Sequence, residues 1–175
     1  MIALALILTI LLIVFGTIVM VGFGIVVFFG APYLPTLQSQ RQTALKLLDL
    51  KPGQTLYDLG CGDGRMLKTA AQAGLYAVGY ELNPVLVAVA KIINWPYRKQ
   101  VRVVWGNYWS TDISKADGIF IFLLDKYMTK FDKKVKNLNK PIKVASYTFE
   151  IPGKEPVKKQ NAVFLYSYEP IASSK

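Results

Sequence analysis

The fold is decided by the stretch Tyr57-Asp58-Leu59-Gly60-Cys61-Gly62-Asp63-Gly64-Arg65. Its apolar beginning predicts a strand over residues 55–59, and three glycines spaced two residues apart predict a tight turn into a helix over residues 65–73. A second predicted strand, over residues 76–81, ends in Glu81. This order is typical of parallel sheets that hold a nucleoside, because glycines let the backbone approach the ligand and a carboxylate binds the ribose hydroxyls.

The segments that follow continue the alternation of strands and helices. Asn83-Pro84 is a helix start, with Asn as the cap and Pro at the first helical position, and the helix is predicted to reach about Trp95. The link over residues 150–161 is polar and lacks helical periodicity, so the strand after it is predicted to run antiparallel to its neighbour. The other predicted elements are strands over residues 101–105, 118–124, 142–149 and 162–169 and a helix over residues 126–138.

The first forty residues contain no Asp, Glu, Lys or Arg, and residues 2–29 are almost entirely apolar. As a helix this run would extend about 42 Å, enough to cross a hydrocarbon core of about 30 Å with tilt. The alternatives are a cleaved signal peptide, which would have a basic start and a shorter apolar run, and a buried core helix. Pro32 and Pro35 end the span, and Thr36 is predicted to cap a further helix that ends near Lys51.

The charges that flank the apolar run indicate its orientation. Only the α-amino group precedes it, whereas Arg41, Lys46 and Lys51 follow it. The positive-inside rule places the N-terminus outside and the rest of the chain in the cytoplasm, or on the equivalent side of the mitochondrial inner membrane. We therefore expect an α/β fold in which a transmembrane helix precedes a Rossmann-like, mostly parallel sheet with helices on both faces and an antiparallel C-terminal edge strand.

Composition excludes some classes of function. The absence of His and the single Cys61 argue against the usual zinc sites and internal disulfides, so no metal ligands are assigned; a metal site built on carboxylates alone is the alternative. The net charge of +10 is carried by residues 41–175. It fits either a solvated basic surface or contact with anionic lipid headgroups, at about 1 kcal/mol per basic residue. Nucleic-acid binding is not expected, because no interleaved aromatic and basic residues mark a strand-tracking groove.

The glycine spacing separates the candidate nucleoside ligands. A dinucleotide fingerprint would need glycine where Arg65 stands, and a P-loop would need a Gly-Lys-Ser/Thr sequence that the chain lacks. The pattern Asp58-x-Gly60-x-Gly62-x-Gly64, with Glu81 at the end of the next strand, resembles motif I and the ribose-binding acid of class I S-adenosylmethionine-dependent methyltransferases. A glycine turn that only packs a helix against a strand is the alternative.

A narrower resemblance combines the apolar anchor, the junction Pro32-Tyr33-Leu34-Pro35-Thr36 and the run Val78-Gly79-Tyr80-Glu81-Leu82-Asn83-Pro84. These features are similar to the membrane-anchored protein-lysine methyltransferases of mitochondria, which act on the ATP synthase c-subunit or the adenine nucleotide translocase, and to their bacterial relatives. The likeness covers residues 30 to about 128 well and the C-terminal third poorly. It implies S-adenosylmethionine as cofactor, an anchor over residues 1–30, a connector and helix over residues 31–53, and a methyltransferase domain over residues 54–175.

The resemblance also implies which residues contact the cofactor. Asp58 would order the loop and approach the cofactor's amino group, Glu81 would bind both ribose hydroxyls, and Leu82 would lie against the adenine. Asn107 stands where the group has Asp, and its oxygen can still accept from the adenine amino group, without charge assistance. Trp109 would either stack on adenine or pack in the core. The complete implied set is Asp58, Gly60, Cys61, Gly62, Gly64, Glu81, Leu82, Asn107 and Trp109.

Asp125 is the candidate catalytic residue, since it follows a central strand at the edge where such sheets bind ligands. It would orient or deprotonate a lysine ammonium; the alternative is a solvated cap for the helix that follows. Tyr33, Tyr127 and Tyr147 are further candidates to line an acceptor channel. Methyl transfer is an in-line displacement at a sulfonium carbon, so positioning carries much of the catalysis and no dedicated base is required.

The sequence thus predicts a single-pass membrane enzyme that methylates a protein lysine near the bilayer, where tethering raises the effective concentration of a membrane-resident substrate. Methylation of a lipid or another amphiphilic small molecule is the alternative within enzymes. A cofactor-binding module without catalysis is the alternative outside them.

Overall fold

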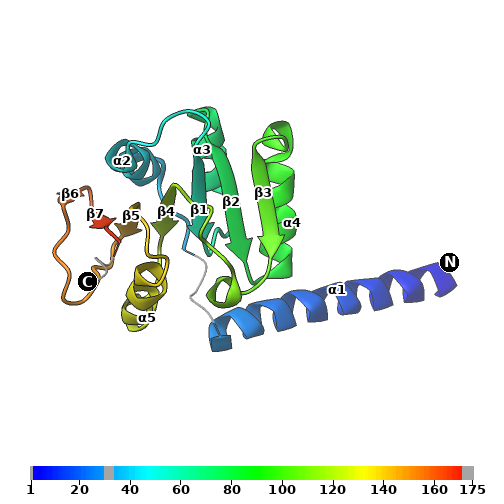
Figure 1. Ribbon diagram of the computed structural model, residues 1–175. Coiled ribbons are helices and arrows are strands. Elements are labelled where there is room, and N and C mark those ends of the chain that lie inside the picture. The colour runs from blue at the N-terminus through cyan, green and yellow to red at the C-terminus, as the bar shows by residue number, and fades with distance from the viewer. Residues whose placement is uncertain (1, 30–33, 171–175) are drawn as a thin grey trace.

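The computed structural model describes residues 2–29 and 34–170. Seven strands form one sheet in the order β3-β2-β1-β4-β5-β7-β6 (Figure 1). The first five in this order are parallel, whereas β7 runs antiparallel to β5 and β6 antiparallel to β7. The strands are β1 Thr55–Leu59, β2 Tyr76–Glu81, β3 Val101–Trp105, β4 Gly118–Ile121, β5 Ile142–Tyr147, β6 Lys158–Gln160 and β7 Val163–Tyr168.

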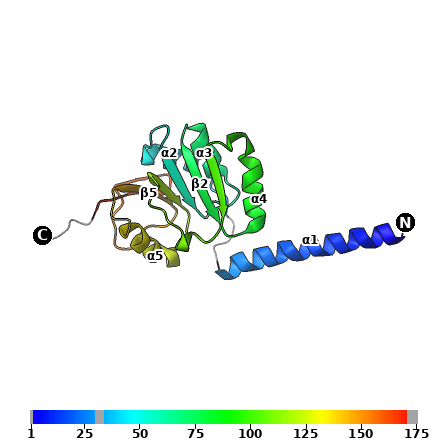
Figure 2. The same cartoon turned by 45° about the vertical axis from the view of Figure 1, so that its right-hand side comes forward.

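Helices cover both faces of this sheet, as predicted (Figures 1 and 2). Leu56 of β1 is buried on the face covered by α2 and α3, whereas Tyr57 and Leu59 are buried on the face covered by α5. This alternation follows from the two-residue period of a strand. The helices are α1 Ile2–Phe29, α2 Gln38–Leu48, α3 Arg65–Gln72, α4 Pro84–Ile93 and α5 Asp125–Lys136, with 3-10 turns at Trp95–Tyr97 and Tyr108–Ser110.

The glycine turn is packed tightly between the first two strands and their helices. A Cβ atom added at Gly79 of β2 would lie 2.5 Å from Leu67 Cδ1 and 2.7 Å from Cys61 Sγ. The start of α3 therefore rests directly on the backbone of β2. Strand order also reverses between β1 and β4, which is where open α/β sheets place their ligand crevice.

Three predicted element boundaries differ from the structure. The N-cap of α2 is Leu37 rather than Thr36, whose carbonyl oxygen accepts a hydrogen bond from the Arg41 guanidinium. β5 ends at Tyr147 instead of residue 149 because Thr148 has a φ of 72°, which an extended strand cannot continue. β4 likewise ends at Ile121, three residues earlier than predicted.

The polar link after residue 150 contains β6, which the sequence did not indicate. Its side chains are all exposed, so no apolar alternation marks it, and it pairs only with β7. Asn161 and Ala162, both with positive φ, form the two-residue turn between them, a geometry that matches the twist of a hairpin. The strand predicted over residues 162–169 is antiparallel as expected, but β6 forms the edge of the sheet beside it.

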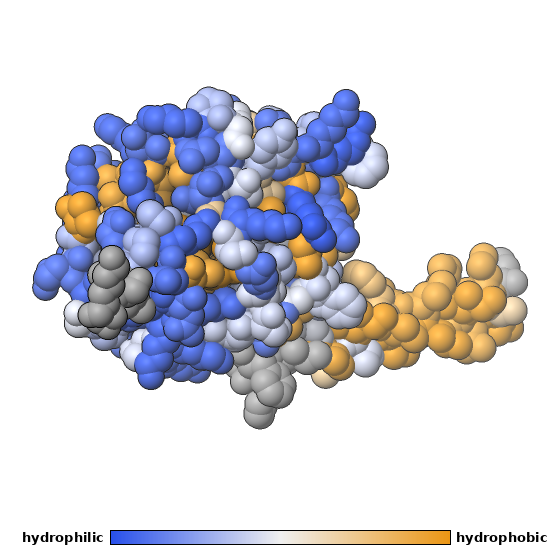
Figure 3. All heavy atoms as spheres, in the orientation of Figure 1, coloured by the Kyte–Doolittle hydropathy of each residue, from blue (hydrophilic) through white to orange (hydrophobic). Residues whose placement is uncertain are grey.

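α1 projects from one side of the domain (Figure 2). Its segment Ile2–Gly22 is long and apolar enough to cross a membrane, with a mean hydropathy of 3.0, and the side chains of residues 2–21 are exposed apart from the half-buried Val19. In Figure 3 it is an apolar rod against a body whose visible surface is largely hydrophilic. Pro32 and Tyr33, to which the sequence assigned the end of the span and a candidate channel residue, lie outside the described residues.

The packing at Gly79 predicts a position-specific cost. Gly79→Ala should lower the free energy of unfolding by about 1–3 kcal/mol, because Leu67 and Cys61 must move to admit a methyl group. Gly106→Ala is the matched control, since no atom lies within 4 Å of the Cβ that it would add. Urea denaturation of both variants measures the difference, and equal stabilities would contradict the packing described for β2.

Candidate active site

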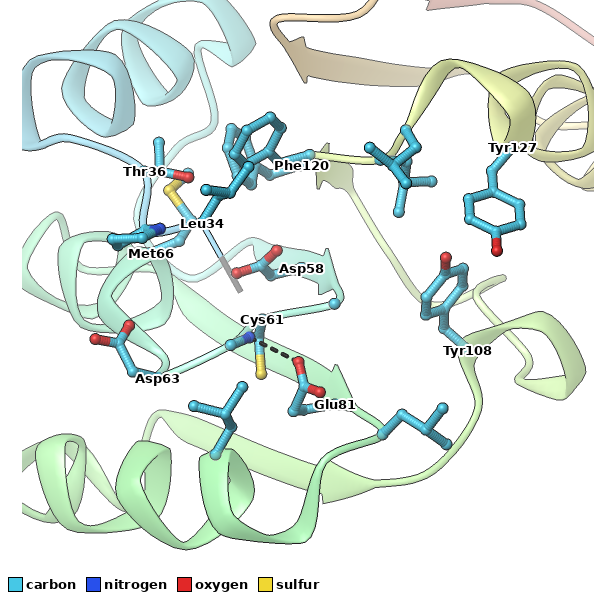
Figure 4. A pocket seen from close by; sticks show the side chains of 18 of the residues that line it. Leu34, Thr36, Asp58, Cys61, Asp63, Met66, Glu81, Tyr108, Phe120 and Tyr127 are labelled. Atoms are coloured by element: carbon cyan, nitrogen blue, oxygen red, sulfur yellow. Dashed lines mark hydrogen bonds between the residues drawn. The ribbon is translucent and has the colours of Figure 1, made fainter. Parts of the chain in front are cut away.

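A cavity of about 330 Å³ opens at the carboxyl ends of β1, β2 and β4 (Figure 4). The glycine turn with Asp58 and Glu81 lines one half, which we call the glycine half. Mostly aromatic and apolar side chains after β3, β4 and β5 line the other, the aromatic half. The residues that line the aromatic half are Asn107, Tyr108, Trp109, Phe122, Leu123, Leu124, Tyr127, Thr148 and Phe149.

The glycine turn is held by its own backbone. The amides of Gly60 and Cys61 both donate to the carbonyl oxygen of Tyr80, each at 2.9 Å. Gly60 has a φ of 90° and exposes its Cα to open space, so the backbone itself forms the floor of the glycine half. An alanine there would be strained, because side chains with a Cβ rarely adopt this conformation.

Glu81 lies where the sequence predicted, at the end of β2, and is only 8% exposed. One carboxylate oxygen accepts from the amide of Gly62 at 2.9 Å, and the other accepts from the amide of Asn83 at 2.8 Å. Two backbone donors therefore fix the orientation of the carboxylate. Each oxygen keeps a second lone pair that a ligand hydroxyl can use.

Asp58 lies at the bottom of the glycine half and is 3% exposed. Its burial, together with the negative charges of Glu81 and Asp63, raises the pKa of its carboxyl to about 8. The side chain is therefore protonated at neutral pH while the cavity holds no cation. A positively charged ligand group in this half would favour the ionised form.

Cys61 and Gly64 have structural roles in the turn. Burial, then the charges of Asp58 and Glu81, raises the pKa of the Cys61 thiol, which makes it a poor nucleophile. Cys61 lines the cavity, while its sulfur lies against Gly79 of β2. Gly64 does not line the cavity; its carbonyl oxygen accepts from Asn94 Nδ2 at 3.0 Å, which ties the turn to the end of α4.

Leu82, Asn107 and Trp109, the residues predicted to contact adenine, all line the cavity, and those contacts stay predictions. The Asn107 oxygen accepts from the amide of Trp109 at 3.0 Å, so one of its two lone pairs is already used. Trp109 is half-buried, and its ring centroid lies 4.8 Å from that of Tyr108 and 6.0 Å from that of Tyr127. Its contact with adenine stays a prediction.

The aromatic half carries the hydroxyls of Tyr108 and Tyr127, which point toward one another in Figure 4. Burial raises the pKa of Tyr108, so this hydroxyl stays neutral and can donate or accept a hydrogen bond. Tyr147, another predicted channel residue, instead packs on Phe122 with ring centroids 4.7 Å apart, and it does not line the cavity.

Asp125 is the first residue of α5 and is exposed to solvent. It does not line the cavity, although Leu123, Leu124 and Tyr127 on either side of it do. The structure thus places it at the rim. Its catalytic role stays a prediction.

Several cavity residues escaped the sequence analysis. Asp63 and Arg65 form an ion pair at the start of α3, and the segment Leu34-Pro35-Thr36, which connects α1 to α2, lines the same cavity. These positions belong to stretches that the sequence analysis quotes, but nothing in those stretches indicates contact with the cavity, which the side chains reach through tertiary packing. Within residues 2–29 and 34–170, no group of three or more His, Cys, Asp or Glu side chains is placed to hold a metal ion.

Among the residues that line the cavity, Thr148 has an unusual backbone conformation. Its φ is 72°, and the amide of Phe149 donates to the carbonyl oxygen of Tyr147 at 2.9 Å, so Thr148 is the centre of a γ-turn. Positive φ is uncommon for any residue with a Cβ and a genuine outlier for a β-branched one. The strained turn aims residues 148 and 149 at the aromatic half.

Comparison with known proteins supports an enzymatic site. A family model described as the ANTKMT methyltransferase domain matches residues 58–158. A protein-lysine N-methyltransferase of Saccharolobus islandicus is 34% identical over 77% of this chain and 92% of its own length. The chain belongs to the ANTKMT methyltransferase family. The predicted family and enzyme class are therefore confirmed, and the match extends well past residue 128, where the sequence analysis expected the likeness to fade.

Other relatives carry more specific names. The ATP synthase c-subunit lysine N-methyltransferase of Xenopus laevis is 32% identical over 71% of this chain. The adenine nucleotide translocase lysine N-methyltransferase of Mus musculus is also 32% identical, over 72% of this chain. The chain spans 56% of the length of each of these two relatives.

A solved structure shares the architecture of this ANTKMT-family chain. An RNA methyltransferase from Salinibacter ruber in complex with S-adenosylhomocysteine superposes with a TM-score of 0.75 and 25% identity, over 81% of this chain and 98% of its own. The Rossmann-like methyltransferase fold is thereby confirmed. The prediction of S-adenosylmethionine as cofactor agrees with the S-adenosylhomocysteine bound in that neighbour.

The γ-turn at Thr148 predicts a stabilising substitution. Thr148→Gly should raise the free energy of unfolding by about 1 kcal/mol, because relief of the positive-φ strain exceeds the added entropy of the unfolded chain. Thr111→Gly is the control, since Thr111 has an ordinary φ of −86° and should lose stability. Thermal unfolding measures the change in stability of each variant. If Thr148→Gly lost as much stability as Thr111→Gly, the backbone at residue 148 would not be strained.

Proposed function

We propose that this chain is a membrane-anchored S-adenosylmethionine-dependent methyltransferase that modifies a lysine of a protein near the bilayer. The observation that carries the lysine assignment is the ring surface of the aromatic half. Lys130 Nζ lies 4.3 Å from the ring centroid of Trp109, and Lys126 Nζ lies 5.0 Å from that of Tyr127. These rings already hold ammonium groups of the chain's own lysines, and the same cation–π attraction would hold that of an acceptor.

The glycine half fits the cofactor. Glu81 presents two oriented carboxylate oxygens to the ribose hydroxyls, and the open Cα of Gly60 admits the methionine part close to the backbone. The buried Asp58, whose carboxyl has a raised pKa, would lie close to the cationic α-ammonium group of the cofactor. When bound, S-adenosylmethionine supplies an electrophilic methyl group on a sulfonium sulfur.

The aromatic half prepares the acceptor. An amine attacks a methyl carbon only in its neutral form, and apolar surroundings lower the pKa of a lysine amine. Leu123 and Leu124 exclude water beside the rings. Since the carboxylates among the described cavity residues lie in the glycine half, Asp125 at the rim is the proposed acceptor of the lysine proton. The hydroxyls of Tyr108 and Tyr127 would orient the nitrogen.

The anchor supports a substrate close to the membrane. The segment Ile2–Gly22 of α1 passes the length and apolarity test for one span. The residues Leu34, Pro35 and Thr36, which precede α2, line the cavity, so the part of the chain that follows α1 in sequence contributes to the wall of the site. This arrangement suits an acceptor that is itself held at the bilayer, with the domain on the cytoplasmic or equivalent side. The lysine methyltransferases named for the ATP synthase c-subunit and the adenine nucleotide translocase lend support from the comparisons.

Transfer of tritium from labelled S-adenosylmethionine tests the acceptor. Membranes that contain the full chain should incorporate label into protein bands that acid hydrolysis resolves as methyl-lysine. Glu81→Gln should reduce incorporation at limiting cofactor by about 10- to 100-fold, because hydrogen bonds between a charged group and a ligand contribute about 1.5–3 kcal/mol. Glu155→Gln, an exposed site on the loop before β6, should leave it unchanged.

The outcomes separate the alternatives. Label confined to extracted lipid or small amphiphiles would overturn the protein acceptor, and so would label in RNA. Cofactor binding by calorimetry without label in any fraction would identify a binding module without catalysis. Absence of cofactor binding would refute the enzyme.

Asp58 should make cofactor binding depend on pH. The free protein keeps this carboxyl protonated below about pH 8, whereas the cofactor's ammonium group favours the carboxylate, so binding releases a proton. Affinity should therefore rise by about tenfold per pH unit between about pH 6 and 7.5, below the pKa of the cofactor's own amine. Calorimetry in buffers of different ionisation enthalpy measures the released proton. This dependence of affinity on pH should vanish in Asp58→Asn. If the variant kept it, the released proton would come from another group.

A further inference from the structure

α4 is apolar on the side that it turns away from the sheet. Its inner side buries Leu86, Val87 and Ala90. On its outer side Ile92 is 73% exposed, and Trp95, in the turn that follows, is 66% exposed. A helix that is apolar all round is ordinarily buried or in contact with a membrane, so the outer side of α4 is not explained by the packing of the domain.

The edge strand β3 extends this apolar surface. Trp105, at its end, is 66% exposed, and its indole nitrogen donates to the carbonyl oxygen of Leu82 at 3.0 Å. The hydrogen bond holds the ring at the surface beside the start of α4. We call the surface formed by Val89, Lys91, Ile92, Trp95, Arg98 and Trp105 the α4 face.

The charge around the α4 face has one sign. Residues 84–105 include four basic residues and no acidic one. The Arg98 guanidinium lies 5.1 Å from the ring centroid of Trp95, so a cation and an exposed indole occupy the same spot. Tryptophan with flanking Lys and Arg is the composition of surfaces that sit in the headgroup layer of a bilayer.

The position of α1 brings the α4 face to that layer. α1 meets the start of α4, where a Cβ added at Gly22 would lie 3.7 Å from Asn83 Oδ1. The 20 residues before Gly22 rise about 30 Å, the thickness of a hydrocarbon core. Figures 1 and 2 both show α1 leaving the domain on the side of α4 and β3. The end of the membrane-crossing part therefore coincides with the base of α4.

We propose that the α4 face lies in the headgroup layer of the bilayer that α1 crosses, with Trp95 and Ile92 at the acyl boundary and Lys91 and Arg98 on anionic headgroups. This inference rests on the proposed anchor and adds to it a second attachment. One helix alone leaves the domain free to rotate about it. Contact through the α4 face fixes that rotation and thereby the direction in which the cavity opens.

Quenching by brominated lipid tests the contact in the full chain. The chain contains three tryptophans: Trp95 and Trp105 on the α4 face and Trp109 in the cavity. The emission of Trp95 is the difference in fluorescence between the unchanged chain and Trp95→Phe. In vesicles with brominated acyl chains and one-third anionic lipid, about half of this emission should be quenched, because an interfacial side chain sits about 5–10 Å into the boundary. The emission of Trp109, obtained in the same way from Trp109→Phe, should not be quenched and is the control.

Charge reversal provides matched variants. Lys91 and Lys133 are both exposed and each lies in the last turn of its helix, α4 and α5. Lys91→Glu should weaken the quenching of Trp95 in anionic vesicles, whereas Lys133→Glu should not. High salt should reproduce the effect of Lys91→Glu, because surface attraction is screened within a Debye length.

The readouts distinguish two failures. If the chain does not float with the vesicles, the anchor in the proposed function is wrong. If it floats but Trp95 is as unquenched as Trp109, the α4 face does not touch lipid and the inference is overturned. Shielding of Trp95 by a second copy of the chain would give that same unquenched result, together with a dimer by chemical cross-linking.

Discussion

The carboxylate of Glu81 is the contact on which the site depends. It accepts one hydrogen bond from the glycine turn, at Gly62, and one from Asn83, the residue that caps α4. A single side chain at the end of β2 thus sets the spacing between the turn and the next helix. Burial is the main cause of the raised pKa of Asp58 beside it, and the fixed negative charge of Glu81 raises that pKa further. Glu81 therefore contributes to both the geometry and the protonation of the glycine half.

The first half of the domain was predictable because its local signals agree with one another. The glycine spacing, the apolar strand before it and the Asn83-Pro84 helix start each indicate the same β-α-β unit, which the structure contains. The features that escaped prediction have no such signature. β6 is exposed throughout and lacks the alternation that reveals a strand, and Thr148 adopts a conformation that its residue type disfavours. The apolar sequence of α4 is typical of a helix packed against a sheet, which accounts for only its inner side.

The apolar helix and the cavity are joined in this fold. The connector residues Leu34, Pro35 and Thr36 form part of the cavity wall, and a Cβ added at Gly22 of α1 would touch Asn83, whose amide donates to Glu81. The cavity is therefore built partly from the segment between the apolar helix and α2. A domain cut free of residues before α2 would lose part of that wall.

Gly22 gives the apolar helix a contact with the domain, which hydropathy alone does not describe. A Cβ added at Gly22 would lie 3.7 Å from the side-chain oxygen of Asn83, so a methyl group there would make ordinary contact with the cap of α4. A helix of the same length and apolarity with leucine or phenylalanine at this position would push against that cap. A chimaera that exchanges the apolar helix must therefore keep a small residue at this position.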